Sequence, residues 1–341
     1  MIARLSRRPL LAALLFSGAT LSAQTPFSFP TANHALYEIG GEQKFFAPTA
    51  PDKPWTSGSF GCVRTDSHGS RMHEGLDIVH LHTDRRGEPT DPVLATADGT
   101  VMYFSAQAGL SNYGKYVVLR HVVDGLEIYS LCAHLSEIAP GLAVGKSIRA
   151  GEVIGTMGRT STAETIAKDR AHVHFELNLL VNDSFAAWFK KNSPGERNDH
   201  GAWNGQNLDG LDAREILLAE HSPVKKFNLL EFVRGQTELC RVLVRAKEFP
   251  YLKRYAALVQ KNPVAEKEGV AGYEIALNYN GVAFALLPRA ASEIKGAARI
   301  QLVSVNAPVA AANHCRRLVV QRGSHWQLTD GGRREMEKLT Y

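Results

Sequence analysis

The chain has 341 residues, of which 44% are hydrophobic and 21% are charged. This is an ordinary globular composition and is long enough for two domains with hydrophobic cores. No apolar run reaches membrane-spanning length. The formal net charge of +5 falls to +2 if residues 1–23 are removed, because three arginines and no acidic residue lie there. The remaining chain has no basic cluster, so we expect no nucleic-acid partner.

The first 23 residues, MIARLSRRPLLAALLFSGATLSA, have a basic start, a short apolar core and a small-residue end. This pattern is typical of a signal peptide, here cleaved near Ala23–Gln24, and fits it better than a buried N-terminal helix. The arginine pair fits both a twin-arginine signal and an ordinary secretory signal. No cysteine follows the apolar run, so we expect no lipid anchor there. The prediction is an exported protein, periplasmic or secreted, without a transmembrane segment once the signal is removed.

Residues 24–54 show weak periodicity, and we expect an extended lead-in. Residues 55 to about 180 are predicted to form a mostly β, antiparallel domain, because short apolar runs alternate with glycine turns. With the short helices that follow, the domain is expected to span residues 55–220. RHVVDGLEIYSL is typical of a hairpin that turns at Asp124-Gly125. NDSFAAWFKKN and DAREILLAEH are predicted to be short helices.

The composition shifts after about Ser222, and residues 221–341 are predicted to form a separate, small α+β module. EFPYLKRYAALVQKN has helical spacing, YEIALNYNGVAFALL indicates a hairpin around Asn280-Gly281, and DGGRREMEKL indicates a closing helix. No catalytic group of residues is evident in this module. Its role and the oligomeric state of the protein are not determined by the sequence.

The four cysteines are Cys62, Cys132, Cys240 and Cys315. An even number in an exported protein suggests disulfides. Cys240 and Cys315 both lie in the C-terminal third, so we expect them to pair, which leaves Cys62 for Cys132. The alternative for Cys132 is a small buried residue, as free cysteines often are.

Among 13 histidines, two pairs are spaced two apart on strand-like runs: His172 and His174 in HVHFEL, and His80 and His82 in VHLHTD. Alternate residues on a strand share one face, so each pair presents two imidazoles in the same direction. The second pair runs into charged turn residues, which favours a solvated loop. The first pair is flanked by apolar residues and is the better candidate for a metal site.

Upstream, HEGLD places His73 and Asp77 four apart around a glycine. Two histidines and one carboxylate are a sufficient ligand set for a catalytic zinc ion with water in the fourth position. His134, in LCAHLS, is predicted to end a strand. This gives four histidines and one aspartate for three ligand places, so the surplus histidines can act as general base or as donors to an oxyanion.

The order of HEGLDI, LCAHLS and HVHFEL, together with SGSFGCVR and NYGKYVVLRH, resembles the lysostaphin-type (LytM-like) zinc metallopeptidases, a family of peptidoglycan endopeptidases. The resemblance covers about residues 55–180, and we expect it to extend to about residue 220. It implies Zn²⁺ as the cofactor, with His73, Asp77 and His174 as the metal ligands. It also implies that His134 and His172 are catalytic.

Asn112 and Tyr113 fall where this family builds one wall of its substrate groove, and Glu176 is expected to be a supporting carboxylate and not the base. Three features depart from the family pattern. Cys132 replaces a tyrosine two residues before the catalytic histidine, and HTDRRGEPTD and STAETIAKDRA lengthen two loops. These loops are expected to reshape the groove.

The resulting prediction is an exported zinc metalloendopeptidase that hydrolyses peptide bonds of peptidoglycan with a zinc-activated water. His134 and His172 would share acid–base and oxyanion roles, and the sequence does not divide these roles between them. The alternative is a non-catalytic relative that binds wall peptides or regulates an amidase. A carbonic anhydrase or a D-Ala-D-Ala carboxypeptidase is disfavoured by ligand identity and spacing.

Overall fold

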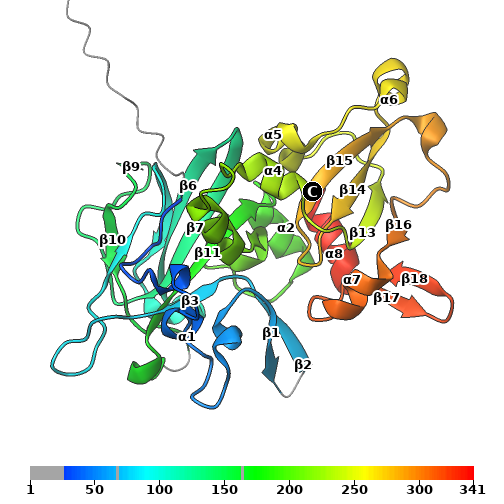
Figure 1. Cartoon of the computed structure of the whole chain (residues 1–341). Coiled ribbons are helices and arrows are strands. Elements are labelled where there is room, and N and C mark those ends of the chain that lie inside the picture. Colours follow the sequence, from blue (N-terminus) through cyan, green and yellow to red (C-terminus); the bar gives the residue numbers. More distant parts are fainter. Residues whose placement is uncertain (1–26, 67–68, 163–164) are drawn as a thin grey trace, which may run out of the picture.

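The computed structural model describes residues 27–66, 69–162 and 165–341 (Figure 1). The predicted signal peptide, residues 1–23, lies outside the described residues. Within them, no helix is both long enough and apolar enough to cross a membrane. Figure 1 shows two β-rich parts side by side, one built from the first two thirds of the chain and one from the yellow-to-red C-terminal third.

A seven-stranded sheet forms the larger part, in the order β12-β11-β7-β6-β5-β9, with β3 paired to β11. Its pairs are antiparallel, which confirms the predicted mostly β fold. The strands are β3 (Leu76–Val79), β5 (Gly99–Ser105), β6 (Lys115–Val123), β7 (Leu126–Leu135), β9 (Ser147–Ile148), β11 (His172–Leu180) and β12 (Leu208–Leu211). The predicted hairpin joins β6 to β7, with positive φ angles at Asp124 (49°) and Gly125 (79°), as the tightest hairpin turns require.

Two small sheets flank this one. The first is a hairpin of β1 (Gly61–Asp66) and β2 (Gly69–His73). The second has the order β4-β10-β8 and contains β4 (Pro92–Leu94), β8 (Glu137–Ile138) and β10 (Val153–Thr156).

The C-terminal module contains a four-stranded antiparallel sheet, β15-β14-β13-β16, and a separate hairpin, β17–β18. These strands are β13 (Cys240–Val244), β14 (Gly272–Leu277), β15 (Ala283–Arg289), β16 (Ile300–Val305), β17 (Val319–Arg322) and β18 (His325–Leu328). The predicted hairpin around Asn280-Gly281 is the β14–β15 connection.

The described residues contain eight α-helices, all short, which lie between or beside the strands. They are α1 (Glu42–Phe45), α2 (Phe185–Asn192), α3 (Ala213–His221), α4 (Leu229–Arg234), α5 (Pro250–Arg254), α6 (Pro263–Glu268), α7 (Ala307–Ala312) and α8 (Asp330–Leu339). The helices predicted from NDSFAAWFKKN, DAREILLAEH and DGGRREMEKL are α2, α3 and α8. The helical spacing of EFPYLKRYAALVQKN yields only α5 and a 3₁₀ turn, Ala256–Leu258.

The lead-in differs from its prediction. Residues 27–54 include a 3₁₀ turn (Ala35–Tyr37) and α1, and Phe27, Phe29 and Phe45 are each at most 4% exposed. Burial of these rings removes a large apolar area from water and outweighs an extended, solvated course. The lead-in is therefore part of the core.

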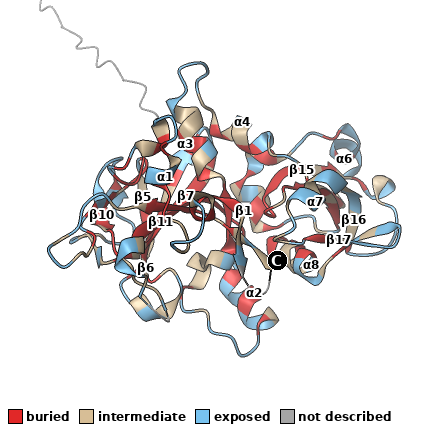
Figure 2. Ribbon diagram, turned by 60° about the horizontal axis from the view of Figure 1, so that its bottom comes forward, coloured by how far each residue is buried: buried red, intermediate tan, exposed pale blue. Residues whose placement is uncertain are grey.

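Among the described residues, the largest buried apolar cluster is continuous from the N-terminal part to the C-terminal module, with members from Phe27 to Leu339. Two smaller buried clusters are separate from it. Buried residues run through the strands of both parts (Figure 2). Polar contacts also join the parts: the Asn280 side-chain amide donates to the Gly210 carbonyl at 2.8 Å, and the Leu180 N–H donates to the Tyr255 hydroxyl at 2.8 Å. The C-terminal module is thus firmly packed on the β11–β12 side of the larger sheet.

The disulfide prediction is wrong. Cys62 on β1 pairs with Cys315, with their Cα atoms 5.5 Å apart, whereas Cys132 and Cys240 are free and buried. Position in the chain was a poor guide, because the fold returns residue 315 to the β1–β2 hairpin across 253 positions of sequence. The alternative interpretation of Cys132, a small buried residue, agrees with the structure.

Candidate functional site

Strand pairing brings the two candidate metal motifs together. On the antiparallel pair β3–β11, Asp77 lies directly opposite His174, where side chains of opposed residues are close. His73 is the last residue of β2, and the chain turns at Gly75 to enter β3. A Cβ atom at Gly75 would lie 2.8 Å from the His174 ring, so only glycine fits at this turn.

The donor atoms of these residues converge. His73 Nε2 lies 3.1 Å from His174 Nδ1 and 3.2 Å from Asp77 Oδ1, and the last two atoms are 2.9 Å apart. Ligand atoms about 2.0–2.1 Å from a tetrahedral zinc ion lie about 3.3 Å apart. All three side chains are buried, and among the described residues they form the one group of this kind whose donor atoms are all within 4.8 Å of one another. The donor set therefore fits zinc in both composition and spacing.

Hydrogen bonds orient the two histidines of this set. His73 Nδ1 lies 2.7 Å from the Ser59 carbonyl oxygen, so Nδ1 carries the proton and Nε2 presents its lone pair to the site. His174 Nε2 donates to Glu176 Oε1 at 2.7 Å, which turns Nδ1 towards Asp77. Burial opposes a charged His174, but hydrogen bonds to Asp77 and Glu176 raise its pKa to about 9.

Glu176 is 1% exposed and also accepts from the Tyr113 hydroxyl and the Asn178 amide, both at 2.8 Å. It shares the strand face of His174, as the alternation predicts. A carboxylate that accepts from the second nitrogen of a metal-binding histidine is a common support in metal sites. The predicted supporting role of Glu176 agrees with this geometry.

His134 and His172 lie beside the donor set, with ring centroids 4.9 Å apart. Each donates its Nδ1–H to a carbonyl oxygen, His134 to Thr160 at 2.8 Å and His172 to Arg170 at 2.7 Å. Each Nε2 is consequently left as a proton acceptor. Burial lowers the pKa of His134 to about 3 and also lowers the pKa of His172, so both imidazoles are neutral near pH 7.

Arg64, from β1, is a site residue that the sequence did not indicate. One of its terminal nitrogens donates to Asp77 Oδ2 and lies 2.8 Å from His73 Nε2. Burial would raise the pKa of Asp77, but His73, His172 and Arg64 hold it well below its usual range. Arg64 thus contacts two of the three candidate ligands.

A cleft of about 630 Å³ opens over this centre. Its lining includes His73, His134 and His174. His172 is 6% exposed, and its Nε2 atom lies 3.5 Å from Asp77 Oδ1. The remaining lining residues are Arg64, Arg71, Met72, Glu74, Ser111, Asn112, Tyr113, Glu176, His200, Asn204, Gly205, Gln206 and Arg316.

Both predicted groove residues line this cleft, and they differ in setting. Asn112 is exposed and accepts from the Thr162 hydroxyl at 2.5 Å. Tyr113 is half-buried, and its ring centroid lies 5.8 Å from that of His174. The other histidine pair stays outside the site: His80 bonds to the Ala171 carbonyl at 2.8 Å, and the side chain of His82 is 71% exposed.

Residues 71–185 match the model of peptidase family M23. They form a peptidase family M23 domain. This match confirms the lysostaphin-type resemblance and includes all five candidate metal and catalytic residues. Arg64 and Arg316 fall outside the matched range.

Curated relatives resemble part of the chain. The chain is 31% identical over 123 residues to a Pseudomonas aeruginosa protein named lipoprotein NlpD/LppB homolog, covering 36% of this chain and 34% of the relative. It is 31% identical over 105 residues to the Escherichia coli murein hydrolase activator NlpD. This alignment covers 31% of this chain and 22% of the relative. The chain thus spans about a fifth to a third of these relatives' length.

Among solved structures, the catalytic domain of the peptidase lysostaphin from Staphylococcus simulans aligns at 25% identity, with a TM-score of 0.25. The alignment covers 35% of this chain and 75% of that domain.

Proposed function

We propose that this protein is a zinc metalloendopeptidase that hydrolyses peptide bonds of peptidoglycan. The observation that carries the proposal is the buried donor set of His73, Asp77 and His174, with two further histidines beside it at the base of an open cleft. A donor set without neighbouring acid–base groups would suit a purely structural metal.

His73, Asp77 and His174 would hold the zinc ion through Nε2, a carboxylate oxygen and Nδ1. When bound, zinc supplies a Lewis acid that polarises a carbonyl and makes water nucleophilic near pH 7. Glu176 fixes the His174 ring through Nε2–H, and the Ser59 carbonyl fixes the His73 ring. These contacts keep the donors in place, so little reorganisation is needed when substrate binds.

His134 and His172 supply the proton acceptors. Because each Nδ1–H is held by a backbone carbonyl, each Nε2 can accept a proton from water or, once protonated, donate to a developing oxyanion. The geometry suits both residues for both tasks. Tyr113 and Asn112 would form the wall of the cleft against which the peptide lies.

We propose that the protein acts in the cell envelope. The Cys62–Cys315 disulfide supports this location, because disulfides form and persist in oxidising compartments. The predicted signal peptide agrees with it, and peptidoglycan would be within reach there.

The test is digestion of purified peptidoglycan by the mature full chain, with mass analysis of the released fragments. We expect soluble peptides to appear, to disappear with a chelator, and to fall at least about a hundredfold in His73→Ala and His134→Ala. His325→Ala, at an exposed position, is the matched control. Undiminished release by both site variants would overturn the proposal.

A second candidate function is that of a non-catalytic activator of another murein hydrolase. Two observations favour it: the Escherichia coli relative is named as such an activator, and Arg64 contacts two of the candidate metal ligands. In this case the chain alone would release no peptides. The chain and its His134→Ala variant would instead stimulate an added peptidoglycan amidase equally.

A further inference from the structure

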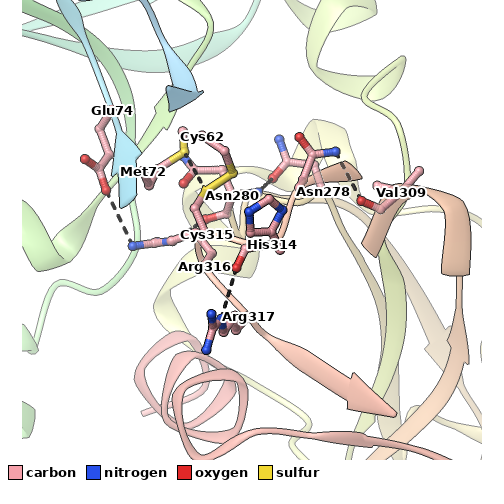
Figure 3. Close-up of a disulfide and its surroundings, with 11 residues drawn as sticks. Cys62, Met72, Glu74, Asn278, Asn280, Val309, His314, Cys315, Arg316 and Arg317 are labelled. Carbon is pink, nitrogen blue, oxygen red and sulfur yellow. Dashed lines mark hydrogen bonds and ion pairs between the residues drawn. A yellow bond between two sulfur atoms is a disulfide. The ribbon is translucent and has the colours of Figure 1, made fainter. Parts of the chain in front are cut away.

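The C-terminal module reaches the cleft through one short segment. Cys315 in this segment is disulfide-bonded to Cys62 on β1, and β1 pairs with β2 so that Gly61 lies opposite His73. The next residue, Arg316, points from the module towards Glu74 of the M23 domain (Figure 3). The disulfide thus holds Arg316 at the edge of the candidate metal centre.

Arg316 has hydrogen-bonding capacity to spare. Its Nε donates to the Asn280 carbonyl at 3.1 Å. Its terminal nitrogens lie 3.6 Å from Glu74 Oε1 and 4.0 Å from Asp209 Oδ1, too far for hydrogen bonds. A guanidinium carries four N–H groups on these two nitrogens. The side chain is 28% exposed, so the groups are open to a ligand.

Arg316 also lies between the cleft and a second, smaller cavity. It lines the 630 Å³ cleft and an adjoining cavity of about 280 Å³, and Gly205 and Gln206 line both as well. The two other cations of the smaller cavity are already engaged. Lys338 lies 2.6 Å from both Glu335 and the Gln206 carbonyl, and Arg334 donates to the Asn192 carbonyl at 2.9 Å. Arg316 is therefore the cation best placed to bind a ligand that extends from the cleft.

The charge of the cleft favours an anionic ligand. Its lining contains three arginines and two glutamates, and the buried Asp77 pairs with one of these arginines, Arg64. A divalent cation at the donor set would therefore leave an excess of positive charge. An arginine fork binds a carboxylate through two parallel hydrogen bonds, which gives both affinity and direction.

We propose that Arg316 binds a carboxylate of the substrate, so that the cleft selects peptides with a free carboxylate close to the bond that is cut. This inference rests on the proposed peptidase function and names the class of its substrate. The C-terminal module then completes the substrate site and is more than a neighbouring domain. A residue outside the M23 match would determine which peptides are accepted.

The test measures peptide binding separately from cleavage. The zinc-loaded full chain carrying His134→Ala, which we expect not to cut, is titrated into fluorescently labelled stem peptides and followed by anisotropy. One peptide has free carboxylates, one has an amidated C-terminus, and one has amidated side-chain carboxylates. Arg316→Ala and Arg316→Lys are compared with Arg317→Ala, which removes the same charge from the adjacent, exposed position.

We expect Arg316→Ala to weaken binding of the free-acid peptide at least about tenfold. Arg316→Lys should cause a smaller loss, because lysine keeps the charge without the fork. Arg316→Ala should not change binding of the peptide in which the recognised carboxylate is amidated. Whether this is the peptide with the amidated C-terminus or the one with amidated side chains identifies the carboxylate that Arg316 binds. Arg317→Ala should bind like its parent.

Equal weakening of acid and amide peptides by Arg316→Ala, an equal effect of Arg317→Ala, or no binding of any peptide would overturn the inference. Thermal unfolding of each variant separates loss of binding from loss of fold, and Arg316→Lys keeps the test valid if the alanine variant unfolds. The peptidoglycan digestion tests the peptidase function separately from this titration. If the wild type releases peptides but Arg316→Ala binds the free-acid peptide as its parent does, the protein is a peptidase in which Arg316 has no role in binding.

Discussion

At the scale of single residues, Arg64 and a metal ion need the same lone pair. His73 donates its Nδ1 proton to Ser59, so Nε2 has one lone pair. That atom lies 2.8 Å from the Arg64 guanidinium and also 3.1 Å from His174 Nδ1, as a shared metal would require. Arg64 must move aside, or keep only its bond to Asp77, when a cation is bound.

We therefore predict that Arg64→Ala binds zinc about tenfold more tightly than the wild type. The substitution removes a competitor for His73 and a like charge close to the ion. Competition with a chromogenic chelator measures the affinity, and Arg333→Ala, at an exposed position on α8, controls for the change in net charge. Weaker zinc binding by Arg64→Ala would mean that Arg64 supports Asp77 as a ligand and does not compete with the ion.

At the scale of elements, the site depends on how closely β3 can approach β11. The β2–β3 turn passes over the His174 ring at Gly75, where an added Cβ would lie 2.8 Å from the ring and 2.7 Å from the Phe175 carbonyl oxygen. These distances are shorter than any normal contact. The turn and the strand pair can keep their spacing only while position 75 has no side chain.

Gly75→Ala should accordingly destabilise the protein by about 1–3 kcal/mol, as overpacking usually does, and should weaken zinc binding because the His174 ring is displaced. Urea unfolding and zinc titration measure the two effects. Gly109→Ala is the matched control, since no atom lies within 4 Å of its added Cβ. If both variants unfold alike, the β2–β3 turn has more freedom than the structure indicates.

At the scale of the whole molecule, one disulfide joins β1, which precedes the M23 domain, to the C-terminal module. Cys62 and Cys315 are 253 positions apart, so the bond removes a large loop entropy from the unfolded chain. It also fixes the segment that carries Arg316. The continuous core holds the two parts together without it.

Replacing both cysteines by serine should lower the free energy of unfolding by about 3 kcal/mol while the fold is kept. Urea unfolding with and without a reductant measures this difference: the wild type should fall to the level of the variant when reduced, and the variant should not respond. A reductant-insensitive wild type would show that this disulfide does not form.

Much of the local structure could be predicted from sequence. The hairpins at Asp124-Gly125 and Asn280-Gly281, and helices α2, α3 and α8, follow from turn chemistry and periodicity, which act over a few residues. The lead-in could not be predicted in this way. Its weak periodicity suggested an extended chain, and its helices form because phenylalanines such as Phe29 and Phe45 are buried against the rest of the fold.

For the site, the motifs HEGLD, LCAHLS and HVHFEL were sufficient to predict the candidate metal ligands and catalytic residues, because the residue types, order and spacing of these motifs indicate metal binding and acid–base chemistry. These candidates are His73, Asp77, His134, His172 and His174. Tertiary structure alone decided the partners of these residues. Arg64 reaches the donors across a strand pairing, and Arg316 arrives through a disulfide that closes 253 positions of chain. Local physics leaves a pattern in neighbouring residues, whereas contacts between distant segments depend on how the whole chain packs.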